Sequence, residues 1–321
     1  MSATADRAPR PATPGGRLRR ALPWLAAAAV FAWLLHRVPV DEVGAALRHG
    51  SYLPLAFYVL LEFILTLPTD AFATREALAV AGVRRSFGEL LRARAATYLL
   101  SLLSYFASLG GIGWWVARGG ERAARATGAV LLMLVANGIA LVLIACAGLL
   151  IDLPPELSPD RRQLLVLLIA GALGGIGAYL GVIAAKVRWL AGRSALAPLF
   201  EAGLAGHAQA VAARLPHMLL LALLHWGAFR IWGIDIPFLR GLALMPVVLL
   251  ITALPITPSG LGTTQVLQVL FFSAWADGAT PEARGADVLA FSLVHWVFSL
   301  VWQGAIGLVG LRLLQRQDRA S

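Results

Sequence analysis

Residues 126–151 read ATGAVLLMLVANGIALVLIACAGLLI and contain no charged side chain. A transmembrane helix needs about 20 consecutive apolar residues to cross the hydrocarbon core of a bilayer. Further apolar segments accompany this one, with approximate limits at 21–35, 51–72, 95–117, 164–185, 215–233, 241–275 and 287–311. The chain of 321 residues therefore predicts an all-α membrane protein with roughly six to eight crossings.

The composition argues against a soluble protein. Hydrophobic residues make up 59% of the chain and charged residues only 14%, whereas soluble domains average about 25% charged residues. The polar connections are too short to hold an appended catalytic domain. We expect a basic tail at 1–20, a single membrane domain at 21–314 and a second tail at 315–321. Segment 21–35 lacks a cleavage motif after it, which favours a retained helix over a signal peptide.

The sequence lacks the common signatures of enzymes and metal sites. Cys146 is the single cysteine and lies in an apolar run, so a disulfide or a cysteine-based metal site is not expected. There is no H-E-x-x-H, P-loop or nucleophile elbow, and the histidines are scattered. We therefore predict no catalytic residue, no metal and no cofactor. The net charge of +10 is dispersed between apolar segments, which favours anionic lipid headgroups over nucleic acid as the partner.

Basic and acidic residues occupy different connections. Arginine and lysine concentrate in both terminal tails and at 73–94, which ends at Arg94, at 118–125 and at 186–193, and Arg214 is counted with this group. The connections 152–163 and 276–287 are richer in acidic residues. The positive-inside rule places the basic group on the cytoplasmic side. We therefore expect an integral protein of a bacterial cytoplasmic (inner) membrane with both termini in the cytoplasm.

Two apolar segments begin and end on the same side under this assignment. Segment 95–117 lies between two cytoplasmic connections, and segment 241–275 lies between two external ones. Because a single crossing cannot return to its own side, we predict that each segment is a re-entrant hairpin. The chain would then have six full spans and two opposed hairpins. Eight simple spans with a weaker charge bias remain the alternative.

Helix-breaking residues mark a possible tip in each hairpin. The two tips read LGGIGW at 109–114 and LPITPSGLGT at 254–263. In a bilayer, broken helices occur only where the chain is buried in protein or lines a cavity. The units 51–151 and 215–311 would form an inverted repeat, an architecture in which broken helices meet at a midplane substrate site. Glycines used for close helix packing are the alternative explanation.

The second tip resembles a known family. Residues 254–262, LPITPSGLG, resemble the P-x-T-P-G-G-L-G-x-x-E signature in the transmembrane region of lysylphosphatidylglycerol synthases and their stand-alone flippase-like relatives. Arg75 falls where the family has an arginine at the end of an early span. Ser259 replaces a glycine, Gln265 replaces the glutamate, and His295 occupies a position that is often arginine. The resemblance implies translocation of phospholipids, hopanoids or polyprenyl-phosphate-linked sugars, without the synthase domain.

Ionisable residues inside apolar segments are costly and are candidate functional residues. Glu62 lies in the middle of a span and is a candidate for pairing with arginine or for proton coupling. Asp70 and Arg75 lie near the cytoplasmic end of the same segment, where an ion pair or a headgroup contact is expected. His225 and His295, each followed by tryptophan, are candidates for proton coupling or for hydrogen-bonded core positions.

Two further arginines are candidates for contact with an anionic headgroup. Arg230 either snorkels to the outer interface or binds a lipid phosphate. Arg118 begins a basic stripe with Arg122 and Arg125 at helical spacing beside the first tip. Such a stripe is either a solvated face or a collector of anionic headgroups.

The leading hypothesis is a flippase-like transporter that moves an anionic lipid between leaflets through a midplane groove. The predicted substrate-binding residues are Glu62, Arg75, Gly110, Gly111, Gly113, Arg118, His225, Arg230, Pro255, Thr257, Pro258, Gly260, Gly262, Gln265 and His295. An intramembrane lipid-modifying enzyme is an alternative, and it would need a convergent pair such as Glu62 with His225 or His295. A scaffold for a glycosyltransferase or lipid-synthesis partner is another.

Overall fold

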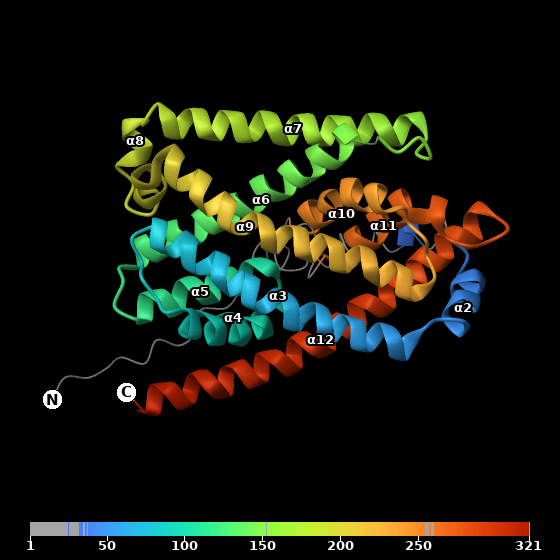
Figure 1. Ribbon diagram of the computed structural model, residues 1–321, viewed down its shortest axis with the longest axis horizontal. Helices are drawn as coiled ribbons and strands as arrows, with labels where there is room; N and C mark the ends of the chain where they lie inside the picture. Colours follow the sequence, from blue (N-terminus) through green and yellow to red (C-terminus); the bar gives the residue numbers. More distant parts are fainter. Residues whose placement is uncertain are drawn as a thin grey trace.

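The computed structural model describes residues 25, 32–34, 36, 38–151, 153–253, 257 and 260–320, with the backbone alone for 317–320. Within these residues the regular structure is entirely helical (Figure 1). In the described part of the chain, five helices are long and apolar enough to cross a membrane, namely α3 (Tyr52–Val80), α6 (Ala123–Ile151), α7 (Pro159–Ala184), α9 (Ala197–Trp232) and α12 (Pro281–Ala320). They correspond to five of the six predicted spans. The sixth, 21–35, lies mostly outside the described residues.

Four shorter helices occupy the segments predicted to form hairpins. They are α4 (Phe87–Ser101), α5 (Tyr105–Arg118), α10 (Phe238–Thr252) and α11 (Thr263–Phe272). At 1.5 Å per residue, a 15-residue helix such as α4 or α10 rises roughly 22 Å, which is less than the ~30 Å hydrocarbon core. The other elements whose bounds the structure describes are α2 (Val40–Arg48), α8 (Arg188–Ala191) and a 3-10 turn at Ser273–Trp275.

The two pairs of short helices lie toward opposite ends of the molecule (Figure 1). The connections before α4 and after α5 are both at the end that carries α8, whereas those before α10 and after α11 are both at the end that carries α2. Helix α4 packs on α5, α3 and α12, and α10 packs on α11, α6 and α9. Each pair is therefore a helix hairpin held against the long helices.

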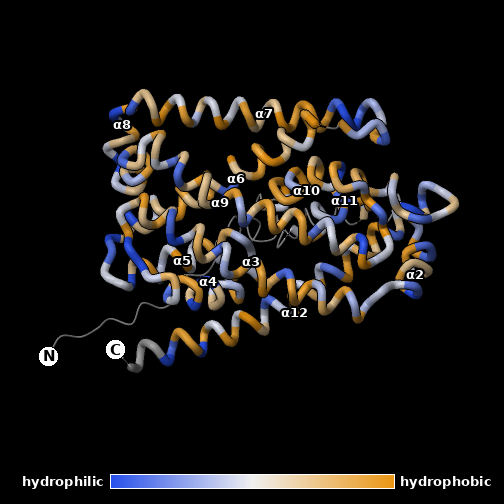
Figure 2. Tube along the Cα trace, viewed as in Figure 1, coloured by the Kyte–Doolittle hydropathy of each residue, from blue (hydrophilic) through white to orange (hydrophobic). Residues whose placement is uncertain are grey.

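The surface has the polarity expected for a bilayer environment. Hydrophilic residues gather at the two ends of the long axis, and the long helices between them are mostly hydrophobic (Figure 2). Large apolar side chains such as Phe57, Leu61, Val166 and Leu167 are exposed on these helices. A soluble monomer rarely exposes apolar patches of this extent. The chain is therefore an integral membrane protein.

Local signals explain where several helices begin and bend. Ser86 and Glu89 form a capping box at the start of α4, and the Ser104 side chain accepts from the backbone N–H of Ala107 at the start of α5. Helix α9 is interrupted at Gly203, where φ is +57°, and ends at Gly233, where φ is +110°. Because φ values in this range are readily reached only by glycine, these two positions shape α9.

The predicted position of the first tip was wrong. The turn between α4 and α5 comprises residues 102–104, and Gly110, Gly111 and Gly113 all lie within α5. A Cβ atom on Gly111 would lie 2.4 Å from the Leu100 side chain, and one on Gly113 would lie 3.2 Å from Val130. At these two positions, glycine allows α5 to approach its neighbours closely, as the packing alternative predicted.

The second tip lies where it was predicted. Gly260 and Gly262 have φ values of +71° and +88° and belong to the connection between α10 and α11. Pro255 and Pro258, which were predicted to contribute to this tip, are outside the described residues.

Candidate functional site

A cavity of about 290 Å³ lies where the two helix hairpins approach each other. The first hairpin contributes Ser101 and Ser104 at its turn, and the α10–α11 connection contributes Thr257 and Gly260. Residues of α3, α9 and α12 complete the wall. The two turns thus line one cavity, although the first turn is not the glycine segment that the sequence indicated.

Asp70 is the centre of a buried charge cluster on the wall of this cavity. Nε of Arg94 donates to Oδ2 of Asp70 at 2.7 Å, and Nη1 of Arg214 donates to Oδ1 at 2.5 Å. The exposed fractions of Asp70, Arg94 and Arg214 are only 4%, 5% and 1%. These three residues, named here the Asp70 cluster, join α3, α4 and α9 inside the bundle.

His217 lies next to the Asp70 cluster on α9. Its Nε2 is 4.0 Å from Oδ1 of Asp70, and its Nδ1 is 2.9 Å from Oγ1 of Thr69. His217 also lines the cavity. It is thus a neighbour of the carboxylate rather than one of its principal partners.

The Asp70 cluster has one positive charge in excess, because one carboxylate faces two guanidinium groups. Nη1 of Arg94 is buried and has no hydrogen-bond partner among the described residues. The same is true of Nε1 of Trp296, on α12. Arg94 and Trp296 both line the cavity. Because buried donors without partners are unfavourable, the wall is suited to a ligand with acceptor oxygens, such as a phosphate.

The remaining lining of the cavity is amphipathic. Hydroxyl and amide groups come from Thr66, Tyr98, Ser101, Ser104, Tyr105, Thr252, Thr257, Ser299 and Gln303. Apolar surface comes from Phe63, Phe106, Leu221, Ala253 and Leu300. This combination matches a ligand with a polar headgroup and an apolar tail.

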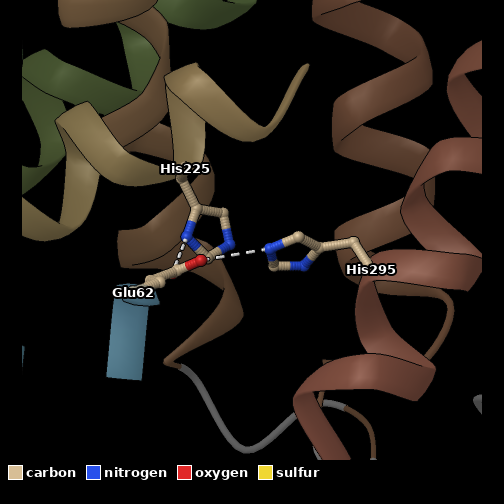
Figure 3. A group of neighbouring side chains, drawn as sticks. All are labelled: Glu62, His225 and His295. Atoms are coloured by element: carbon tan, nitrogen blue, oxygen red, sulfur yellow. Dashed lines mark hydrogen bonds and ion pairs between the residues drawn. The ribbon is translucent and has the colours of Figure 1, made fainter. Parts of the chain in front are cut away.

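A second buried cluster connects the same long helices. Glu62 on α3 contacts both His225 on α9 and His295 on α12 (Figure 3). Oε1 of Glu62 is 2.6 Å from Nδ1 of His225, and Oε2 is 3.3 Å from Nε2 of His295. The two imidazole rings are 4.6 Å apart between centroids. These residues form the Glu62 cluster, which unites three of the predicted site residues and pairs Glu62 with histidine instead of arginine.

Three predicted arginine contacts lie elsewhere. Arg75 pairs with its neighbour Glu76, with Nη2 and Oε1 2.7 Å apart, so the expected pair with Asp70 was wrong. Arg118 lies over the ring of Trp114 in α5. Arg230 pairs with Asp235 at 3.1 Å near the end of α9. None of the three belongs to the described lining of the cavity.

The second tip is held by short-range hydrogen bonds. Oε1 of Gln265 accepts from the backbone N–H of Gly262 at 2.7 Å, and the hydroxyl groups of Thr257 and Thr263 are 3.1 Å apart. Gln265 is fully buried and its Nε2 lacks a partner among the described residues. Gln265 therefore fixes the start of α11, while Thr257 and Gly260 face the cavity.

Comparison with known families assigns the chain. The family profile described as the lysylphosphatidylglycerol synthase TM region matches residues 21–302. The chain belongs to the lysylphosphatidylglycerol synthase transmembrane family. No curated protein and no solved structure shows significant similarity to it. The resemblance at residues 254–262 is thus confirmed, and it identifies a membrane protein related to lipids.

Sequence reasoning missed the two arginines of the Asp70 cluster in this member of the lysylphosphatidylglycerol synthase family. Arg94 and Arg214 were counted among the cytoplasmic basic residues, yet both are buried against Asp70. One signal was available for Arg94. Ser86 and Glu89 have capping-box spacing, which starts a helix early enough to carry Arg94 into the hairpin.

Proposed function

We propose that the protein translocates an anionic lipid, a phospholipid or a polyprenyl-phosphate-linked species, between the leaflets of the membrane. The observation that supports this most directly is Arg94, a buried residue that lines the cavity and whose Nη1 has no hydrogen-bond partner among the described residues. A phosphate would accept from this guanidinium group. The lipid chains would stay in the bilayer while the headgroup passes through the cavity.

The arrangement of the helix hairpins supports this proposal. We interpret both hairpins as re-entrant and the units around them as an inverted repeat, with the termini in the cytoplasm. Broken helices that meet near the midplane are a common way to build a transport site. The turns of both hairpins line the cavity that holds Arg94, so a movement of either hairpin would change access to the headgroup site.

Reconstituted vesicles test the proposal. Fluorescent phosphatidylglycerol is compared with a neutral glycolipid carrying the same label, and a membrane-impermeant quencher reports how much label reaches the outer leaflet. We expect the protein to accelerate exchange of the phosphatidylglycerol only. Arg94→Gln should slow exchange by at least about tenfold, because a hydrogen bond to a charged group contributes roughly 1.5–3 kcal/mol.

Arg75→Gln is the matched control. Like Arg94, Arg75 pairs with a carboxylate, but it lies outside the cavity lining. It should retain the exchange rate of the unmodified protein. Exchange no faster than in protein-free vesicles, or equal rates for Arg94→Gln and the unmodified protein, would contradict the proposal.

A lipid-modifying enzyme is the second candidate function, and one observation favours it. Glu62 converges with His225 and His295, which supplies groups able to transfer a proton. Mass spectrometry of lipids from the same vesicles distinguishes the two candidates. Unchanged lipids together with exchange support translocation, and a new lipid species supports the enzyme. If neither is seen, a scaffold for a lipid-synthesis or glycosyltransferase partner is favoured.

A further inference from the structure

The Glu62 cluster brings three metal-ligating side chains together inside the bundle. One carboxylate oxygen of Glu62 and one ring nitrogen each of His225 and His295 lie within 4.8 Å of one another. The three residues come from α3, α9 and α12 and are far apart in the sequence. Glu62 and His295 are only 4% and 6% exposed. Such convergence does not follow from the helical repeat of any one element.

We infer that Glu62, His225 and His295 form a binding site for a divalent transition metal ion of the zinc type. Two imidazole nitrogens and one carboxylate oxygen are a ligand set that zinc uses in proteins, with a fourth position left for water or another oxygen. Imidazole ligands favour zinc, copper, iron or nickel over magnesium and calcium. The proposal does not rest on lipid translocation.

One carboxylate oxygen and the two ring nitrogens lie within 4.8 Å of one another, so binding a metal ion would require side-chain adjustments. Bonds of about 2.0–2.1 Å in a tetrahedral site place ligand atoms roughly 3.4 Å apart. Oε2 of Glu62 and Nε2 of His295 are 3.3 Å apart, and Oε1 of Glu62 and Nδ1 of His225 are 2.6 Å apart. Because these two separations involve different oxygens of Glu62, the carboxylate would have to rotate so that one oxygen is directed toward both nitrogens.

Hydrogen bonding accounts poorly for the close contact with His225. Nδ1 of His225 makes no hydrogen bond among the described residues, although Oε1 of Glu62 is 2.6 Å away. The N–H direction of the ring is therefore not aligned with this oxygen. Figure 3 shows the carboxylate beside both rings, with a dashed line from it to one nitrogen of each. Nε2 of His295 is hydrogen-bonded to Oε2 of Glu62 at 3.3 Å, so Nδ1 of His225 is the nitrogen that faces the carboxylate without an aligned hydrogen bond, and a shared ion would orient it.

The site also joins the long helices. A bound ion would link α3, α9 and α12, which pack against one another along the bundle. Phe63 and Trp296, the sequence neighbours of Glu62 and His295, line the cavity. The ion would therefore fix the part of the bundle that borders the cavity, and its binding energy would add to the stability of the fold.

Metal binding can be measured on the purified full chain in detergent, produced with an affinity tag that contains no histidine. The protein is stripped with a chelator, dialysed, and titrated with Zn²⁺ or Co²⁺ alone. We expect about one tightly bound ion per chain, visible absorption of four-coordinate Co²⁺, and a higher melting temperature with Zn²⁺. Glu62→Gln, His225→Gln and His295→Gln should each remove the cobalt absorption and the thermal shift.

His217→Gln and His207→Gln are the matched controls. Both are buried histidines of α9, but they contact Thr69 and Tyr179. They should retain the absorption and the thermal shift. The inference is overturned if the unmodified protein binds no ion under these conditions, or if the control variants lose binding to the same degree as the cluster variants. Because the unmodified protein alone can give the first result, misfolding of a variant does not obscure the outcome.

Discussion

The Asp70 cluster and the Glu62 cluster have the same arrangement, but the basic side chains are arginines in the first and histidines in the second. In each, a carboxylate of α3 lies between a basic side chain of α9 and one from a further helix. Guanidinium groups stay charged at all relevant pH values, whereas imidazole is readily neutral. The Asp70 cluster thus keeps a fixed positive excess, which suits an anion. The Glu62 cluster can present neutral nitrogens beside a carboxylate, which suits a cation.

The largest expected loss of stability follows from removing the carboxylate of the Asp70 cluster. Asp70→Asn would leave Arg94 and Arg214 buried without a counter-charge. Removing one partner of a buried ion pair costs about 3–5 kcal/mol, so we expect this loss in the free energy of unfolding, measured by denaturant titration in mixed micelles. Glu76→Gln is the control, because the partly exposed Arg75–Glu76 pair should be worth ~1 kcal/mol or less. Similar losses for the two variants would show that the Asp70 cluster is not a fixed-charge core.

Replacing the carboxylate of the Glu62 cluster by an amide should cost less free energy of unfolding than Asp70→Asn. In chelator-treated protein, Glu62→Gln leaves two histidines that can lose their charge, so the loss should be that of a buried hydrogen-bond partner, roughly 1–3 kcal/mol. The same titration measures it. A loss as large as that of Asp70→Asn would mean that the histidines are held charged, and the contrast between the two clusters would fail.

Much of the helical plan was predictable, because it depends on features that are local in the sequence. The five described long helices follow from apolar length, and the turn at Gly260 and Gly262 follows from helix-breaking residues. The first turn was misplaced because glycine has two uses in membrane helices, and in α5 it permits close packing. The turn itself contains no glycine or proline. Ser104, which caps α5, was the available signal.

The site was less predictable, because its residues meet across long distances in the sequence. Glu62 was found because it is a charged residue in the middle of an apolar span. Arg94 and Arg214 were assigned by the charge of their segments, but their burial depends on Asp70, from which they are 24 and 144 positions away. No linear pattern reports such a pairing. The repeated His-Trp pairs at 225–226 and 295–296 were a weak sign that His225 and His295 belong together.

The smallest expected loss in the free energy of unfolding involves Glu89, a carboxylate near the surface. It serves as the reference for the buried carboxylates Asp70 and Glu62. Oε2 of Glu89 accepts from the hydroxyl and backbone N–H of Ser86 at 2.7 Å and 2.8 Å. These bonds, the side-chain one foremost, hold the pKa of Glu89 below its usual value. Ser86→Ala should destabilise the protein by about 1 kcal/mol at neutral pH, as for other N-caps.

The pH dependence of the Ser86→Ala effect separates the hydrogen bond to the Glu89 carboxylate, which titrates, from the backbone cap, which does not. Because the pKa of Glu89 is lower in the folded state, its contribution is complete above the unfolded value of about 4.3 and is lost as pH falls through the folded value. The difference in the free energy of unfolding between Ser86→Ala and the unmodified protein should therefore become smaller in acid. It should not vanish, because the bond from the backbone N–H of Glu89 to Oγ of Ser86 does not titrate. A gap that stays constant from neutral pH to below 4 would assign the whole effect to that backbone cap.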